Sequence, residues 1–386
     1  MVATLVIWVA AFVLIGVFLL SAGTVGLAVR HQRSDRCRDE VTRSVRRELF
    51  DRFGRADPEW EAWVASLDAV ERRALRSLLD RYLRTISGQE RGSFLVLARA
   101  MGLRRRAIDS LQDGSVSERL RALAWLALLD RRVPARLLRT HCTDHRRLRE
   151  AAASVVLAHR EAYTDGDALG TELLIHDGQE VLTVYGLETL ARLNERGSTP
   201  LLERGADAAE SWRADFLVQV LTVLSECQLT DPDEALEWVL PLLRHDDATV
   251  RATAVSVFEQ AGWRRGLRDR LPIEAVTDDP APAVRRSAFD LLAAWGDRRS
   301  RERLLEAAQQ EPDERTRLSA YRAFLALADN DTVDEAAVDD PLWAWARRDD
   351  QDQDVGTVLS WSETTVPSPP SLELDPTDTV TGETDE

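Results

Sequence analysis

The chain has 386 residues, and its 66 acidic side chains outnumber the 50 basic ones to give a formal net charge of −16 at neutral pH. This length fits two or three ordinary domains or one long repeat array. The three cysteines, Cys37, Cys142 and Cys227, are odd in number, widely spaced and without a CxxC pair. The pattern argues against a disulfide framework and a zinc site, and it suits a reducing cytoplasm.

Every basic side chain is an arginine, because the sequence contains no lysine. A strongly acidic chain with arginine in place of lysine resembles the proteins of extreme halophiles, and of haloarchaea in particular. In such proteins, surface carboxylates keep the fold hydrated in molar salt. The resemblance concerns composition alone.

The first 29 residues carry the strongest local signal. No charged side chain occurs between Met1 and Val29, and about 20 apolar residues suffice to cross a bilayer. Arginines follow the apolar run directly, at Arg30, Arg33, Arg36 and Arg38. Because arginine marks the cytoplasmic end of a span, we predict a single transmembrane helix over residues 1–29. The N-terminus would then lie outside the cell membrane, and the body of the chain and its C-terminus in the cytoplasm.

A cleaved signal peptide is the alternative, with Ser21-Ala22-Gly23 as the small-residue cleavage site. A signal peptide has positive residues before its apolar run, and this chain has none there. The apolar run is also longer than that of a signal peptide. The sequence therefore favours the membrane anchor.

A basic juxtamembrane segment, residues 30–56, precedes a predicted helical cap over residues 57–109. Asp57-Pro58-Glu59 is typical of a helix start, with aspartate as the N-cap and proline at the first helical position. Apolar side chains then recur every three or four residues. This spacing is typical of helices that bury one face in a core.

One pattern recurs between residues 110 and 328. Each copy has an acidic turn, an arginine early in a helix and an alanine three residues later, and the best copies contain Arg251, Arg285 and Arg317. Weaker upstream copies are placed at Arg121, Arg149 and Arg213, with a degenerate one near Leu182 and Tyr185. Repetition at this period predicts an array of about seven helix-pair repeats.

The Asp-x(2–5)-Val-Arg-x-x-Ala signature, clearest in Asp247–Ala254 and Asp279–Ala288, resembles HEAT repeats of the short, phycobilisome-lyase-like type. The resemblance implies an all-α solenoid in which stacked repeats share one continuous core. It also implies that the acid and the arginine tie adjacent repeats together. Structural roles are accordingly expected for Asp247, Arg251, Asp279, Arg285 and Arg317.

Residues 329–386 differ from the array in composition. Acidic residues dominate this segment, which contains only two basic residues, Arg347 and Arg348. Apart from a short helix expected near Pro341–Trp345, no apolar period is present. We predict an acidic and mostly disordered tail.

Positive charge gathers in the part of the chain next to the predicted anchor. Residues 30–149 contain 28 arginines and 17 acidic residues, whereas residues 150–386 contain 22 and 49. One cluster follows the anchor, and a second begins at Arg104, Arg105 and Arg106. These clusters could contact anionic lipid or an acidic partner, although positive-inside topology and solvated helix faces explain them more simply. Nucleic acid is disfavoured because the aromatic residues fall at core positions.

The sequence contains no recognisable catalytic motif, so we expect no enzymatic activity, cofactor or metal. HExxH, GxGxxG, Walker and GxSxG patterns do not occur. His141 and His145 would share a face of one helix, but the Thr143-Asp144 between them is typical of a turn. No histidine precedes a glutamate, so the iron site of the HEAT-like deoxyhypusine hydroxylases is not transferred.

The sequence therefore predicts a membrane-tethered cytoplasmic scaffold or adaptor that binds other proteins, themselves associated with the membrane. Solenoids present long surfaces suited to protein partners. Two alternatives stay open. One is an accessory subunit of a membrane enzyme such as a glycosyltransferase, and the other is an enzyme with a cryptic metal site.

Overall fold

The computed structural model describes residues 38–347, apart from 56, 130, 177, 179, 197–198, 230–234 and 328–339. The predicted anchor over residues 1–29, the arginines Arg30, Arg33 and Arg36, and residues 348–386 lie outside the described residues. Every regular element in the described part is helical, which confirms the all-α class there. No helix of that part is long and apolar enough to cross a bilayer.

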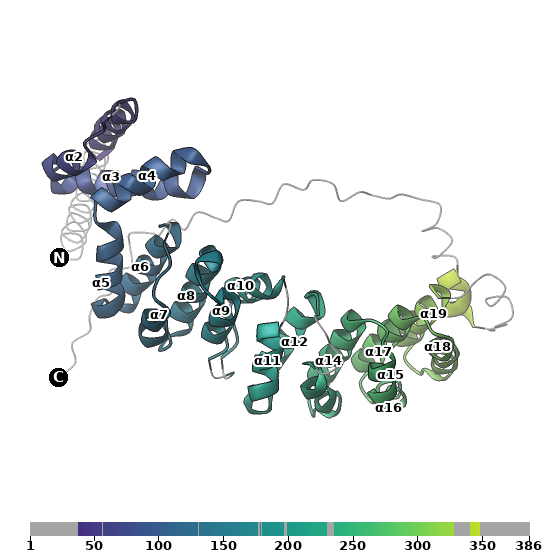
Figure 1. The fold of residues 1–386 in the computed structure, drawn as a ribbon. Coiled ribbons are helices and arrows are strands. Elements are labelled where there is room, and N and C mark those ends of the chain that lie inside the picture. Colours follow the sequence, from purple (N-terminus) through teal and green to yellow (C-terminus); the bar gives the residue numbers. More distant parts are fainter. Residues whose placement is uncertain are drawn as a thin grey trace, which may run out of the picture.

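An N-terminal block consists of helix 38–53, α2 (Trp60–Ser66), α3 (Ala69–Thr85) and α4 (Gln89–Ala100) (Figure 1). Helix 38–53 lies in the segment predicted to be juxtamembrane, and its Val45 and Leu49 are buried in the core of the block. Buried side chains from all four helices form this core, which is separate from the main core of the chain.

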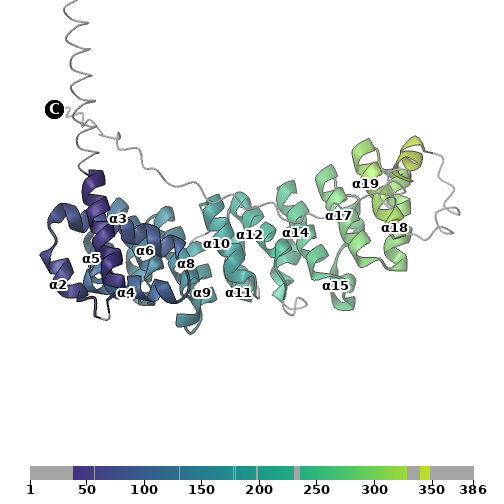
Figure 2. The same ribbon diagram turned by 90° about the horizontal axis from the view of Figure 1, so that it is seen from above.

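The remaining helices follow one another as pairs in an extended row, with the N-terminal block at one end (Figures 1 and 2). The pairs are α5 (Leu103–Asp113) with α6 (Val116–Leu128), α7 (Ala135–His141) with α8 (Arg146–Ala158), α9 (Gly166–Leu174) with α10 (Val184–Asn194), α11 (Thr199–Ala208) with α12 (Ala214–Glu226), η3 (Glu237–Arg244) with α14 (Ala248–Ala261), α15 (Arg265–Arg270) and α16 (Ile273–Thr277) with α17 (Pro282–Trp295), and α18 (Arg298–Gln310) with α19 (Glu314–Leu325). Two further short 3₁₀ turns are η1 (Arg160–Ala162) and η2 (Ala209–Ser211).

The second helices of these pairs form one continuous layer. Contacts run in order from α6 through α8, α10, α12, α14 and α17 to α19. The first helices form the other layer, in which α5 contacts α7, and α11 contacts both α9 and η3. This arrangement of stacked helix pairs is compatible with an α-solenoid.

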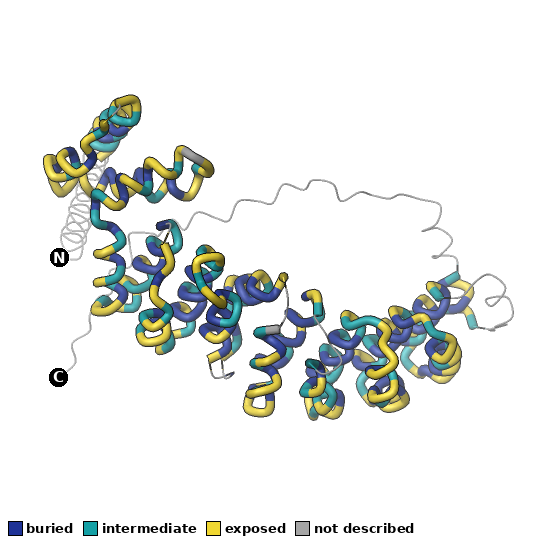
Figure 3. The backbone as a smooth tube through the Cα atoms, in the orientation of Figure 1, coloured by how far each residue is buried: buried dark blue, intermediate teal, exposed yellow. Residues whose placement is uncertain are grey.

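One apolar core runs between the two layers, from Ala107 in α5 to Ala346 in helix 341–347. Figure 3 shows buried positions on the sides of helices that face their neighbours and exposed positions at many of the turns between them. A single short pair cannot enclose its own apolar face, so each pair depends on the next one for burial. At the distal end, Trp343 of the short helix packs on Tyr321 and Phe324.

Local sequence explains where the distal helices begin. Asp247, Asp297 and Asp313 are the N-cap residues of α14, α18 and α19, and each side chain accepts a hydrogen bond from a backbone N–H in the first turn. Pro282 starts α17, where its missing N–H and fixed φ suit the first turn. These caps set the register that positions the arginines described next.

Candidate functional site: an arginine ladder and a basic groove

Arginines at the fourth residue of helices in the second layer join neighbouring pairs. In α14 this residue is Arg251, which donates to both carboxylate oxygens of Asp279 at 2.8 Å and to the His245 carbonyl at 2.7 Å. In α17 it is Arg285, which donates to the two oxygens of Glu311 at 2.6 and 2.7 Å. Each guanidinium therefore links the start of its own helix to the following pair.

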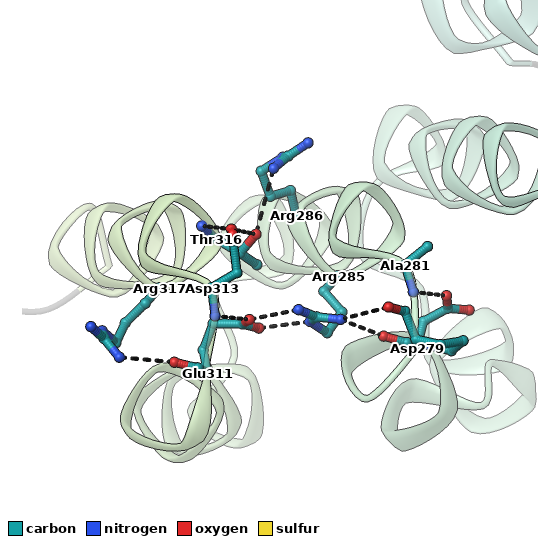
Figure 4. A network of polar contacts seen from close by, with 9 residues as sticks. Asp279, Ala281, Arg285, Arg286, Glu311, Asp313, Thr316 and Arg317 are labelled. Atoms are coloured by element: carbon teal, nitrogen blue, oxygen red, sulfur yellow. Dashed lines mark hydrogen bonds and ion pairs between the residues drawn. The ribbon is translucent and has the colours of Figure 1, made fainter.

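The contacts continue along the array because each acid accepts from two arginines, and Figure 4 shows the part of the series from Asp279 to Arg317. The Asp279 carboxylate accepts from Arg251, and its carbonyl accepts from Arg285 at 2.7 Å. Glu311 does the same, since its carboxylate binds Arg285 and its carbonyl accepts from Arg317 at 3.0 Å. We term this series the arginine ladder. Its members are Arg251, Asp279, Arg285, Glu311 and Arg317, with Asp340 at the distal end, 3.1 Å from Arg317.

The ladder residues lie mostly inside the protein. The Arg285 and Glu311 side chains are 11% and 2% exposed, and those of Arg251 and Asp279 are also largely buried. Burial alone would raise the pKa of the Asp279 carboxyl, but hydrogen bonds from Arg251 and the Ala281 N–H, with the nearby guanidinium charges, lower it below its ordinary value. Carboxylates and guanidiniums in such surroundings need each other as partners.

Asp247 lies outside the ladder, although the sequence signature aligned it with Asp279. It is the N-cap of α14, and its carboxylate accepts from the Thr249 N–H at 2.7 Å, which lowers its pKa. Asp247 stands four residues before Arg251, whereas Asp279 stands six before Arg285. Because the signature allows two to five residues after its aspartate, it treats the helix cap Asp247 and the ladder residue Asp279 as the same position.

Arg149, the fourth residue of α8, forms the same two kinds of contact as Arg251, one to a backbone carbonyl six residues earlier and one to a carboxylate. Its guanidinium donates to the Thr143 carbonyl at 3.0 Å and to the Glu180 carboxylate at 2.6 Å. The arginine side chain is only 8% exposed, while that of Glu180 is exposed. The weaker upstream repeat predicted at Arg149 thus carries the same pattern of bonds as the distal ones.

In α6 the equivalent arginine is Arg119, and the predicted Arg121 is not at this position. Arg119 is the fourth residue of α6 and pairs with Asp144 at 2.8 Å. Arg121 lies on another face of the same helix, where it lines a surface hollow that Arg119 does not line. The capping box formed by Ser115 and Glu118 fixes the helix start, so counting from this cap would have found Arg119.

The middle of the array lacks an arginine at the fourth helical position. The residues there are Leu187 in α10 and Leu217 in α12, while Arg213, the predicted repeat position, is the N-cap residue of α12. Gln219 joins these helices instead. Its side-chain amide accepts from the Leu182 N–H at 2.7 Å and donates to the Leu182 carbonyl at 3.0 Å.

A basic groove lies where the array meets the N-terminal block. It consists of two adjoining hollows that share Arg104 and Arg131, the larger with a volume of about 670 Å³. Side chains from α4, α5, α7, α9 and the loops between helices line it. The charged ones are Arg99, Arg104, Arg131, Arg132, Arg136, Arg139 and Asp165.

Three of these charged side chains already have partners, and one of them is Arg104, which donates to the Arg132 carbonyl. Arg139 binds Glu172 at 2.6 Å, which raises the pKa of the arginine, and Asp165 caps α9. The other exposed cations form no side-chain hydrogen bond or ion pair within the part of the chain that the structure describes. These cations are Arg99, Arg131, Arg132 and Arg136. As far as the described residues go, the groove therefore presents four arginines without an ionic partner to solvent.

The three consecutive arginines of the second basic cluster do not form one patch. Arg104 lines the basic groove and donates to the Arg132 carbonyl at 3.2 Å. Arg106 lines a separate hollow, and Arg105 lines neither. About 100° of rotation per helical residue separates neighbouring side chains. Of the four arginines predicted to contact lipid or a partner next to the anchor, Arg30, Arg33, Arg36 and Arg38, the structure describes Arg38, which is exposed on helix 38–53.

The histidine pair singled out in the sequence lies on two different helices. His141 is the last residue of α7, and His145 is the N-cap residue of α8, where its ring accepts from the Arg147 N–H. Within the described ranges, no group of three or more His, Cys, Asp or Glu residues could hold a metal ion. The buried Cys142 and Cys227 are free thiols.

No protein-family model matches the chain, and no curated protein matches it. Its likeness to HEAT repeats therefore rests on its own sequence signature. The all-helical architecture is compatible with that likeness.

Proposed function

We propose that this chain is a non-catalytic scaffold of the HEAT-repeat class, held at the cytoplasmic face of a membrane by residues 1–29, and that it binds an acidic partner protein in the basic groove. The observation that carries this proposal is the set of exposed arginines in the groove that have no ionic partner among the described residues, Arg99, Arg131, Arg132 and Arg136. Guanidiniums gathered on one surface form strong charge-assisted hydrogen bonds with carboxylates.

A protein partner suits the groove better than nucleic acid does. The aromatic side chain that lines the groove is Tyr163. Its hydroxyl donates to the Val133 carbonyl at 2.9 Å and accepts from the Val133 N–H at 3.0 Å. A ring held in this way is poorly placed to stack on bases. Carboxylates of an acidic peptide segment need no stacking surface.

The membrane tether and the HEAT-repeat class are supported by observations that do not involve the basic groove. An uncharged segment of 29 residues followed by arginines is typical of a single-pass anchor. Arginines at the fourth residue of α8, α14, α17 and α19 repeat the same bonds, as expected of a repeat array. An anchored array would keep the groove beside membrane-bound partners, including enzymes such as glycosyltransferases.

The groove is tested by crosslinking pull-down of the full chain from its own cells. We expect a specific partner with the wild type and a loss of at least about tenfold with Arg131→Gln/Arg132→Gln. The matched control is Arg298→Gln/Arg299→Gln, two adjacent exposed arginines at the start of α18, which should recover the partner normally. Equal recovery by both double variants would exclude the groove, and the absence of any specific partner would exclude the scaffold.

The tether is tested separately by fractionation. The full chain should sediment with membranes and resist extraction at high salt or alkaline pH, because an apolar span is released only by detergent. A chain that begins at residue 30 should move to the soluble fraction. Release of the full chain by salt alone would exclude an anchor.

A further inference from the structure

A hollow separate from the basic groove also lies at the joint between the N-terminal block and the array. We term it the joint pocket. It has a volume of about 250 Å³, and its lining residues are Arg76 of α3, Leu103, Arg106, Ala107 and Ser110 of α5, and Glu118, Arg121, Ala122 and Trp125 of α6. It shares no residue with the basic groove. Three helices thus bring arginines from distant parts of the sequence to one place.

Arg76 and Arg106 of the joint pocket repel each other, whereas Arg121 lies near Glu118 and donates to the Ser117 carbonyl at 3.4 Å. Partial burial of the guanidinium lowers the pKa of Arg76, and the charges of Arg106 and Arg73 lower it further. Such like-charge crowding costs free energy unless an anion lies between the guanidiniums. Neither Arg76 nor Arg106 forms a side-chain hydrogen bond or ion pair in the described part of the chain.

Glu118 contributes the single carboxylate of the lining. Its Oε2 accepts from the Ser115 N–H and hydroxyl, both at 2.8 Å, and these bonds lower its pKa. The carboxylate is therefore already engaged in capping α6. The lining carries three positive charges and one negative, so a net charge of about two remains for a ligand to neutralise.

The shape of the joint pocket suits a compact anion. Leu103, Ala107 and Ala122 are buried and form an apolar floor. The three arginine side chains are exposed at the rim, where a ligand can reach them, and the Ser110 hydroxyl adds a further donor. Planar guanidiniums that approach from different directions match the oxygens of a phosphate group, each forming up to two parallel bonds.

We propose that the joint pocket binds a phosphate group through Arg76, Arg106 and Arg121, and that the bound group stabilises the contact between the N-terminal block and the array. The phosphate could belong to a soluble phosphate ester or to an anionic lipid head group, because both present phosphate oxygens with a net negative charge, whereas the phosphate of phosphatidylcholine is neutralised by its own choline. The inference does not depend on the scaffold function, since the groove and the pocket use different residues.

The test uses the full chain reconstituted in phosphatidylcholine vesicles, with inorganic phosphate as the probe. Thermal unfolding is followed by tryptophan fluorescence in phosphate and in chloride at equal ionic strength. A ligand that binds only the folded state raises Tm as its concentration increases. We expect this rise in the wild type and in Arg105→Gln. We expect Arg106→Gln and Arg76→Gln to bind phosphate at least about tenfold more weakly.

Arg105→Gln is the matched control, because it removes the same charge one residue away on the same helix and lines neither hollow. Arg106→Gln should stay folded, since it relieves repulsion, and its Tm in chloride should not fall below that of the wild type. A wild type that responds to phosphate no more than to chloride would overturn the proposal. So would a normal phosphate response in both Arg106→Gln and Arg76→Gln.

A second arm distinguishes the two sources of phosphate. Vesicles that contain phosphatidylglycerol should abolish the response to inorganic phosphate if the lipid head group fills the pocket. An unchanged response in these vesicles would identify the soluble ester as the ligand. Either result supports the site, because both require the response in phosphatidylcholine and its loss in Arg106→Gln. A failed pull-down from the basic groove would leave this result untouched.

Discussion

The Arg285 guanidinium and the Glu311 carboxylate lie 26 residues apart in the sequence and form a bidentate ion pair, with N–O distances of 2.7 and 2.6 Å. Both side chains are buried. The same guanidinium also donates to the Asp279 carbonyl, so it joins the turn before α17 to the helix pair after it. Packing in the distal array therefore depends on charges held within the protein.

Loss of Arg285 should destabilise the chain strongly. Arg285→Gln leaves the Glu311 carboxylate buried without its cation, and removal of one partner of a buried pair costs about 3–5 kcal/mol. Urea unfolding followed by circular dichroism measures the change. Arg298→Gln, which removes an exposed i,i+4 pair with Glu302, is the control and should cost at most about 1 kcal/mol.

The double variant Arg285→Gln/Glu311→Gln separates the cost of losing the ion pair from the cost of leaving the Glu311 carboxylate buried without a cation. It removes the unpaired charge, so it should be more stable than Arg285→Gln alone. If Arg285→Gln and Arg298→Gln cost the same free energy, the ladder is no more than a surface feature.

The lowered pKa of Asp279 predicts how the free energy of unfolding changes with pH. Its pKa in the folded chain lies below the ordinary value of 3.8, so the unfolded chain takes up the proton first as the pH falls. The stability due to the ionised carboxylate is thus complete above about pH 3.8 and is lost as the pH falls through the folded pKa. Asp279→Asn should be less stable than the wild type at neutral pH, and the two should converge in acid. Urea unfolding over a pH series measures this, and a difference that does not change with pH would contradict it.

Gly186 should not tolerate a side chain. A Cβ at this position would lie 2.7 Å from the Glu150 carboxylate, which is buried and accepts from the N–H and hydroxyl of Thr183 at 2.8 Å. Gly186→Ala must displace this carboxylate from its donors, and we expect a loss of about 1–3 kcal/mol in unfolding experiments.

Gly92 provides the matched control for that substitution. It also lies within a helix, but a Cβ there would have no neighbour within 4 Å. Gly92→Ala should therefore stabilise the chain, by about 0.5–1 kcal/mol, through the higher helix propensity of alanine. A similar effect of both substitutions would mean that the contact between Gly186 and Glu150 does not matter.

The two buried thiols should be unreactive in the folded chain. Burial raises the pKa of Cys142 to about 12 and that of Cys227 to about 11, so hardly any nucleophilic thiolate forms at neutral pH. Mass spectrometry after treatment with iodoacetamide should find both unmodified, and guanidinium chloride should expose both to rapid alkylation. Fast labelling of either one under native conditions would show that the array opens locally.

The sequence pattern predicts the ladder arginines more reliably than it predicts their partners. Arg251, Arg285 and Arg317 each follow an acidic turn, which marks the helix start. Glu311 and Asp340 were missed, because an acid in a turn can equally be a helix cap or a ladder position. The sequence pattern pointed to Arg121 and not to Arg119. Which of the two is the fourth residue of the helix follows only from the position of the cap at Ser115.

The sequence by itself determined the helical class, the repeat period and the concentration of arginine near the predicted anchor, because each is a property of residue order and composition. Only the tertiary structure decided which arginines are neutralised. Arg104, Arg105 and Arg106 are adjacent in the chain, yet helix rotation separates them, and Arg106 comes near Arg76 only because α3 packs against α6, the partner helix of α5. Charge pairing depends on distances of a few ångströms between elements, and local sequence does not set those distances.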